Sequence, residues 1–199
     1  MTTSDTATGD PRPLRADAVR NRAKIVEAAK AAFSERGLET QMEDIARRAG
    51  VGVGTLYRHF PTKDALVRAL IVDKMERMAE HAKAAMKDDG DPWEAFAGVL
   101  RKGAEQTVRD RALAQVFSSQ PQEAYRTALE DETELAARMA WLLRRAQDAG
   151  LARPDADPAD IPIVMCGLGA VIHNERNWER YLALMLDGFR NTTVERLPE

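Results

Sequence analysis

Apolar residues recur at intervals of three and four along most of the chain, and this spacing predicts an all-α protein of about nine helices. The first predicted helix runs from about Ala16 to Arg36, and Gly37 is expected to end it. Its apolar stripe is formed by Ile25, Ala28, Ala29, Ala32 and Phe33. The pattern contains no competing strand periodicity and no internal repeat. The chain is therefore expected to fold entirely as packed helices.

Further helices are expected over residues 62–86, 111–118, 122–149 and 177–190. Two more are expected, one that begins at residue 92 and one that ends near residue 172. Asp91 and Pro92 form a typical helix start. The helix that ends near residue 172 has two possible starts, at Asp157 with Pro158 as its first residue, or at Asp160 with a proline inside the first turn. The helix over 62–86 is long enough to act as a rigid lever between two parts of the chain.

Residues 40–64 contain two short amphipathic helices joined by a glycine turn. In the first, Met42, Ile45, Ala46 and Ala49 share one face. Thr40 is available to cap this helix, and Gly50 is expected to stop it. The second helix opens near Gly52 or Val53. Its inner face holds Leu56 and Phe60, and its outer face holds Thr55 and Arg58, flanked by Tyr57 and His59. This arrangement predicts a helix-turn-helix, against the alternative of an ordinary helical hairpin with a polar face.

The segment EDIARRAGVGVGTLYRHFPTKDAL, residues 43–66, resembles the N-terminal signature of the TetR family of transcriptional regulators. The resemblance covers residues 18 to about 78 and implies that residues 41–60 are the helix-turn-helix. It implies that the DNA-binding residues are Thr40, Val53, Gly54, Thr55, Tyr57, Arg58, His59 and Lys63. Gly52 stands where the family often has a hydroxyl residue, so a capping group is missing there. Val53 could equally be half buried, and Lys63 could be a solvated surface lysine instead of a phosphate contact.

Charge is distributed unevenly along the chain, which has a net charge of −3. Residues 11–68 contain twelve Lys/Arg and seven Asp/Glu, whereas residues 69–199 contain 17 and 23. A basic head of this kind attracts phosphates, and an acidic body does not. We accordingly expect a flexible arm at 1–15, a DNA-binding domain at 16–64, a ligand-binding and dimerisation domain at 65–193, and a tail at 194–199.

The single cysteine, Cys166, excludes an internal disulfide framework, and the polar N-terminus does not resemble a signal peptide. The longest apolar run, residues 161–172, is too short to cross a bilayer. We therefore expect a cytoplasmic protein with no membrane partner. The three histidines are isolated, so no metal site and no cofactor are expected. Gly167 and Gly169 resemble part of a dinucleotide fingerprint, but they lie within helical periodicity and without a preceding strand.

Methionine and aromatic residues of the body are either plain core or the lining of an apolar chamber. The residues concerned are Met75, Met78, Trp93, Phe96, Phe117, Met139, Trp141 and Met165. The family resemblance implies the chamber, with an apolar or aromatic effector. The last two helices carry more apolar positions than one core face should require, which predicts a homodimer. The expected interface residues are Leu168, Ile172, Trp178, Leu182, Met185 and Phe189.

These patterns together predict a homodimeric, small-molecule-responsive transcriptional repressor that binds a palindromic, double-stranded DNA operator. An enzyme built on the same body is the first alternative, although no catalytic constellation accompanies it. An adaptor that uses the head to bind protein is the second. Binding that weakens steeply with salt on DNA would distinguish the regulator from the adaptor.

Overall fold

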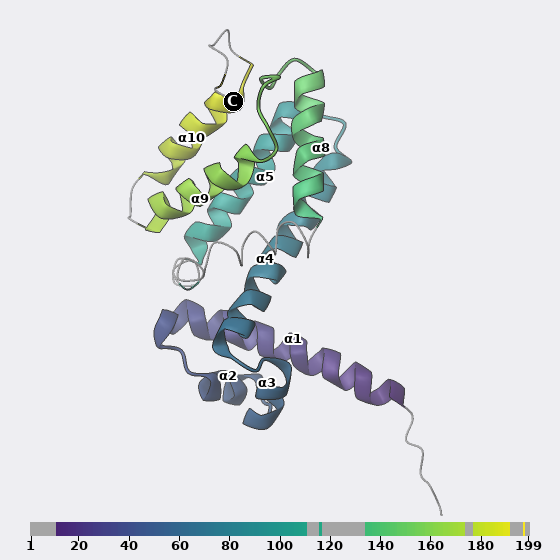
Figure 1. Ribbon diagram of the computed structural model, residues 1–199, viewed down its shortest axis with the longest axis vertical. Helices are drawn as coiled ribbons and strands as arrows, with labels where there is room; N and C mark the ends of the chain where they lie inside the picture. The colour runs from purple at the N-terminus through teal and green to yellow at the C-terminus, as the bar shows by residue number, and fades with distance from the viewer. Residues whose placement is uncertain (1–10, 111–115, 117–133, 174–176, 192–196, 198–199) are drawn as a thin grey trace, which may run out of the picture. The chain divides into compact units, whose positions relative to one another are not determined.

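The computed structural model describes residues 11–110, 116, 134–173, 177–191 and 197, and in this part of the chain it contains eight α-helices and one short 3-10 helix (Figure 1). The elements are α1 (Pro11–Arg36), η1 (Gly37–Glu39), α2 (Met42–Ala49), α3 (Val53–His59), α4 (Lys63–Met86), α5 (Pro92–Arg109), α8 (Leu135–Asp148), α9 (Asp160–His173) and α10 (Trp178–Phe189). The all-α prediction is confirmed. The helix expected over 111–118 and the start of the one expected over 122–149 lie outside the described residues, apart from Val116.

The chain forms two compact units, which divide between Leu66 and Val67. We call the first unit the head and the second the body. In the head, α1 packs against α2, and α2 packs against α3. Gly37 ends α1 with a φ of 53°, a left-handed conformation that glycine adopts without steric cost, so the predicted stop is confirmed.

In the body, α5 packs against both α8 and α9, and α9 packs against α10. The start of α5 is fixed as the sequence predicts, because Asp91 Oδ1 accepts a hydrogen bond from the Trp93 N–H at 2.8 Å. The Phe96 ring lies at the centre of this core, 5.9 Å from the Trp93 ring and 5.7 Å from the Phe189 ring. Aromatic side chains of α5 and α10 therefore join in one core. No helix within the described ranges is long and apolar enough to cross a membrane.

The structure decides between the two possible starts of α9 in favour of Asp160. Pro162 consequently lies in the first turn, where its missing N–H needs no partner inside the helix. The residues before the helix form a polar turn instead. In this turn, the Asp157 N–H donates to Asp160 Oδ2 at 2.9 Å.

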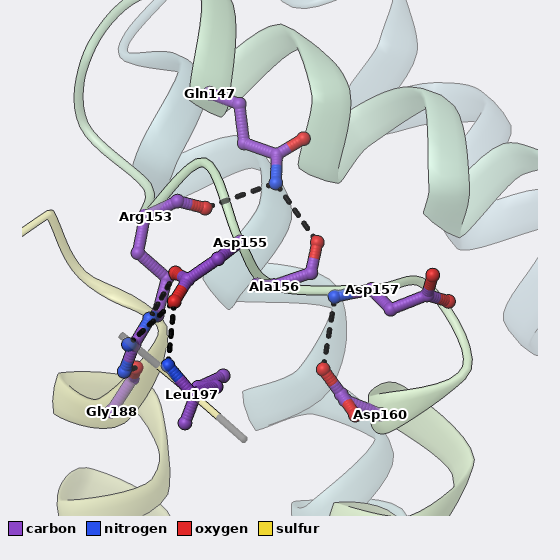
Figure 2. Close-up of polar contacts among 8 residues, drawn as sticks. All are labelled: Gln147, Arg153, Asp155, Ala156, Asp157, Asp160, Gly188 and Leu197. Carbon is purple, nitrogen blue, oxygen red and sulfur yellow. Dashed lines mark hydrogen bonds and ion pairs between the residues drawn. The ribbon is translucent and has the colours of Figure 1, made fainter. Parts of the chain in front are cut away.

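A network of hydrogen bonds organises the loop between α8 and α9 (Figure 2). Gln147 Nε2, on α8, donates to the carbonyl oxygens of Arg153 and Ala156, both at 3.0 Å. The Arg153 guanidinium donates two bonds to the Asp155 carboxylate, at 2.6 and 3.0 Å. Asp155 Oδ2 also accepts from the backbone N–H of Leu197 at 2.8 Å. These bonds hold the pKa of Asp155 far below its ordinary value, chiefly through the guanidinium.

Candidate nucleic-acid interface

The turn between α2 and α3 depends on a single glycine. Gly50 has a φ of 67°, and its backbone N–H points back to the carbonyl oxygens of Ala46 and Arg47, which closes the end of α2. Ile45 and Ala46 are fully buried against the rest of the head. The predicted stop and the predicted inner face of this helix are both confirmed.

The short helix α3 is anchored by its inner face. Leu56 and Phe60 are buried, as the four-residue spacing predicts. Gly52 is the N-cap residue, and its carbonyl oxygen accepts from the Thr55 N–H at 2.9 Å and the Leu56 N–H at 3.1 Å. No side-chain cap is present, in line with the missing hydroxyl at this position.

The outer face of α3 is open to solvent. Val53 is 41% exposed and Tyr57 is 40% exposed, so each presents a large part of its side chain to solvent. Arg58 is also exposed, and its guanidinium lies along the helix, donating to the Gly54 carbonyl and to Thr55 Oγ1, each at 3.2 Å. Donors and an apolar side chain therefore share one surface that the head does not use for its own packing.

Gly54 has a further property within this surface. A Cβ placed there meets no atom of the protein within 4 Å, leaving aside the chain neighbours and the helix's own backbone. The packing of the head therefore does not require a glycine at this position. His59, at the other end of α3, is half buried, with its ring 6.4 Å from that of Phe60.

Tyr57 has a partner that the sequence analysis did not identify. Its hydroxyl donates to Glu43 Oε1, on α2, at 3.3 Å. Desolvation and the adjacent carboxylate raise the pKa of Tyr57, so the phenol remains a neutral hydrogen-bond donor. The two residues are 14 positions apart on different helices, and no local pattern indicates that they meet.

The structure corrects the role predicted for Thr40. Its side chain is buried, and its hydroxyl donates to the Ala32 carbonyl, on α1, at 3.0 Å. The residue at the N-cap of α2 is Gln41, and it makes no side-chain capping bond. The prediction that Thr40 caps α2 is therefore wrong, because η1 returns the chain against α1 and directs the hydroxyl into the head. The same burial argues against the expected contact of this side chain with DNA.

Lys63 is half buried and serves the head itself. Its Nζ donates to the Leu38 carbonyl at 2.6 Å and lies 5.7 Å from the centre of the Phe33 ring. An ammonium has three donors, so this tie to the α1–α2 connection still permits a phosphate contact. Beside it, Thr62 Oγ1 accepts from the Ala65 N–H at 3.0 Å, which confirms the predicted cap of α4.

Ion pairs fix α2 against α1. Arg48 donates two bonds to the Glu35 carboxylate, at 2.6 and 2.7 Å, and these bonds lower the pKa of Glu35. Arg36 and Arg47 both pair with Asp44. The basic charge of α2 is thus matched by carboxylates within the head, whereas the Arg58 guanidinium, on α3, bonds to oxygen atoms of its own helix.

The residues predicted to line a ligand chamber in the body differ in how far they are buried. Met75, Met78, Trp93, Phe96 and Met139 are buried and Met165 is half buried, whereas Phe117 lies outside the described residues. Met78 packs closely on Gly103, since a Cβ there would lie 2.7 Å from Met78 Cε and 3.5 Å from Met165 Cε. Trp141 is 42% exposed, so it is not a core residue of the body. Instead, its ring lies 5.7 Å from the Arg145 guanidinium.

The residues predicted to form a dimer interface lie mostly inside the single chain. Leu168, Ile172, Leu182 and Phe189 are buried, and Trp178 and Met185 are half buried. Burial within the protomer leaves the first four little surface for a second copy. The large apolar residues that α9 and α10 expose are instead Ile163, at 71%, and Leu184, at 55%.

Known protein families match both the head and the body. Residues 25–70 match the family model of the bacterial regulatory proteins of the tetR family, and residues 91–191 match the C-terminal domain of SbtR-like transcriptional regulators. The HTH-type transcriptional repressor KstR2 of Mycobacterium tuberculosis is 31% identical over 146 residues, which cover 68% of this chain and 71% of the relative.

Solved structures show the same fold. A TetR transcription regulatory protein from Mycobacterium vanbaalenii is 38% identical, with a TM-score of 0.62 over 89% of this chain and 99% of that one. RolR, solved in complex with the ligand resorcinol, is 23% identical, with a TM-score of 0.67 over 88% of this chain and 90% of that one. The chain belongs to the TetR family of transcriptional regulators.

Proposed function

We propose that this regulator is a homodimeric repressor that binds a palindromic operator through α3 and releases or captures it in response to a small molecule. The observation that carries the proposal is the outer face of α3, where Val53, Tyr57 and Arg58 are exposed while Leu56 and Phe60 anchor the helix from behind. The repressor role is supported by the relative KstR2, which is itself a repressor.

The side chains of this face suit different parts of a DNA duplex. Arg58 and Thr55 hold each other in the free protein, and both can turn to base edges in the major groove. The Val53 methyl groups suit a thymine methyl. The Tyr57 hydroxyl and Lys63 suit phosphates, which give affinity without sequence information.

The proposed division of roles can be tested through the salt dependence of binding. Replacing Lys63 with alanine should weaken binding to all sequences and lower the salt slope of the dimer by about 2, because each of its two copies loses one phosphate contact. Arg109→Ala, in the body, removes the same charge from an exposed position and should leave the slope unchanged. Equal slopes for wild type and Lys63→Ala would show that this lysine serves only the head.

A dimer would use the apolar side chains that the protomer leaves exposed on its last two helices. Ile163 of α9 and Leu184 of α10 are exposed apolar side chains that two copies can bury against each other around a twofold axis. The double variant Ile163→Glu, Leu184→Glu should be a helical monomer that loses operator binding. Leu38→Glu, which places a charge on an exposed position of the head, should remain dimeric. A wild-type monomer by light scattering at micromolar concentration would contradict the proposal.

The body would hold the effector on the side of α4 that carries Met75 and Met78. Because α4 runs without a break from Lys63 to Met86, a ligand bound beside it can favour one arrangement of the two heads. Linkage limits the effect to the differential affinity for the two arrangements, typically about 1 to 3 kcal/mol, or about 5- to 150-fold in operator affinity. Apolar and aromatic compounds that raise the melting temperature should shift operator binding. If no compound of a broad panel does either, the sensing role fails and the DNA-binding role survives.

A further inference from the structure

The body carries a groove between α5 and α10, with a volume of about 360 Å³. Its apolar floor is formed by Trp93, Trp178, Leu182 and Leu186. Leu184, the exposed apolar residue of α10, is two positions from Leu182 and from Leu186 and therefore lies across the helix from them. The groove is thus separate from the face proposed for dimerisation. Its size falls within the range of small-molecule sites, which are mostly apolar with a few polar groups.

The charged groups of the groove favour a cation. Glu105, Glu179 and Asp187 line it and are exposed at its rim. The two guanidiniums that line the groove, those of Arg101 and Arg190, both lie near the carboxylate of Glu94, which is outside the groove. Arg101 Nη1 lies 2.6 Å from Glu94 Oε2, and Arg190 Nη2 lies 3.9 Å from Glu94 Oε1. The remaining charge of the groove is negative, which attracts a positively charged ligand.

The chain itself places a cation on the aromatic floor. The Arg190 guanidinium lies 4.7 Å from the centre of the Trp93 ring, within the distance of a favourable cation–π contact. Arg190 is exposed, so an organic cation can take its place on the ring. Trp178 also lines the groove, is half buried and adds a second aromatic surface.

The Trp93 indole supplies a second, independent indication of a ligand. Its side chain is almost fully buried, and Nε1 has no hydrogen-bond acceptor among the described residues. A buried donor without an acceptor is unfavourable, and a ligand that displaces Arg190 from the ring and brings an oxygen atom to Nε1 would remove this cost. A ligand with a cationic centre and a nearby oxygen acceptor could contact the aromatic floor and the rim carboxylates through the cation, and accept a hydrogen bond from the Trp93 indole through the oxygen.

We propose that this groove binds a small organic ammonium ion that also carries an oxygen acceptor. The inference goes beyond the proposed function, because this groove contains neither Met75 nor Met78 and is a second ligand site of the body, separate from the effector site proposed beside α4. Two features of the groove should affect ligand affinity in opposite directions. The rim carboxylates attract the ligand, whereas Arg190 competes with it for the Trp93 ring.

Benzoylcholine is a suitable probe, and its carbon isostere 3,3-dimethylbutyl benzoate is a neutral compound of the same shape. Isothermal titration calorimetry on the full chain without DNA should show benzoylcholine binding about tenfold or more tightly than the isostere. Glu179→Gln and Asp187→Asn should each weaken benzoylcholine binding about two- to fivefold. Arg190→Gln should strengthen it by a similar factor, because the competing cation is removed.

Glu76→Gln, at an exposed position of α4 outside the groove, is the matched control and should bind benzoylcholine as the wild type does. Trp93→Phe keeps a ring and removes the indole N–H, and it should weaken benzoylcholine binding, with circular dichroism confirming that the variant is folded. Equal binding of probe and isostere, or unchanged binding in the rim and Arg190 variants, would overturn the inference. Both of these results would leave operator binding by the head unchanged. A loss of operator binding in the wild type would instead overturn the proposed function.

Discussion

Gly54 offers a test in which stability and DNA binding should change in opposite directions. It lies in the first turn of α3 with its backbone in a region that alanine adopts readily, and an added Cβ meets no protein atom within 4 Å beyond its own neighbours and helix backbone. Alanine is the better helix former by up to about 1 kcal/mol. Gly54→Ala should therefore stabilise the head by up to about this amount.

The same methyl group should weaken operator binding if the outer face of α3 enters the major groove. An extra carbon in a closely packed contact costs about 1 to 3 kcal/mol, which corresponds to about a 5- to 150-fold loss of affinity. Stability of the head can be followed by hydrogen exchange of peptides that cover α2 and α3. Operator affinity can be followed by fluorescence anisotropy of labelled DNA.

Gly98 provides the control for this experiment. It lies within α5 of the body, and a Cβ placed there likewise meets nothing within 4 Å. Gly98→Ala should stabilise the body and leave operator affinity unchanged. If Gly54→Ala stabilises the head and binds the operator as tightly as the wild type, the outer face of α3 is not in close contact with DNA, and the reasoning is refuted.

Three further results are expected. Thr40→Val removes the buried hydrogen bond to the Ala32 carbonyl, so hydrogen exchange should show the head opening more readily by about 0.5 to 1.5 kcal/mol, while operator affinity at 25 °C stays the same. Gly167→Ala puts a Cβ 2.4 Å from the Tyr181 hydroxyl oxygen and should lower the melting temperature of the body, and Tyr181→Phe in the same chain should restore much of the loss. Asp155 has a lowered pKa in the folded state through Arg153, so it stabilises the fold above its unfolded pKa of about 3.9 and loses this effect as the pH falls further. Urea unfolding should accordingly show an advantage over Asp155→Asn that is constant from about pH 5 upwards and shrinks below about pH 4.

The sequence predicts helix ends well because they depend on local chemistry. Gly37, Gly50 and Gly150 all have positive φ values, where a side chain would be strained, and each follows a helix as predicted. Asp91 and Thr62 supply capping oxygens within three residues of the N–H groups that they bind. Such signals need no knowledge of the rest of the fold.

Contacts between helices are where the sequence analysis fails. The capping role given to Thr40 is wrong because its nearest partner, the Ala32 carbonyl, is on another helix. The link between Tyr57 and Glu43 likewise joins two helices across the turn. Neither contact has a periodic signal, because residues far apart in sequence are brought together only by packing.

The apolar faces of α9 and α10 also take part in contacts that the sequence does not indicate. Their apolar residues exceed what two helices need for each other, and the sequence analysis assigns the excess to a second copy. In the structure, α5 covers much of this excess, since it packs against α9 and its Phe96 ring meets Phe189 of α10. The sequence cannot reveal that a helix about 70 residues earlier uses the same surface.

The proposal that α3 reads DNA as part of a dimer is tested most directly by selecting genomic fragments with the purified protein and sequencing them. Wild-type protein should enrich a palindrome whose half-site centres are about one helical turn apart. Arg58→Ala should relax or change the base preference at one symmetry-related position in each half-site and leave the spacing intact. No enriched sequence with the wild type, or an identical motif with Arg58→Ala, would contradict the account.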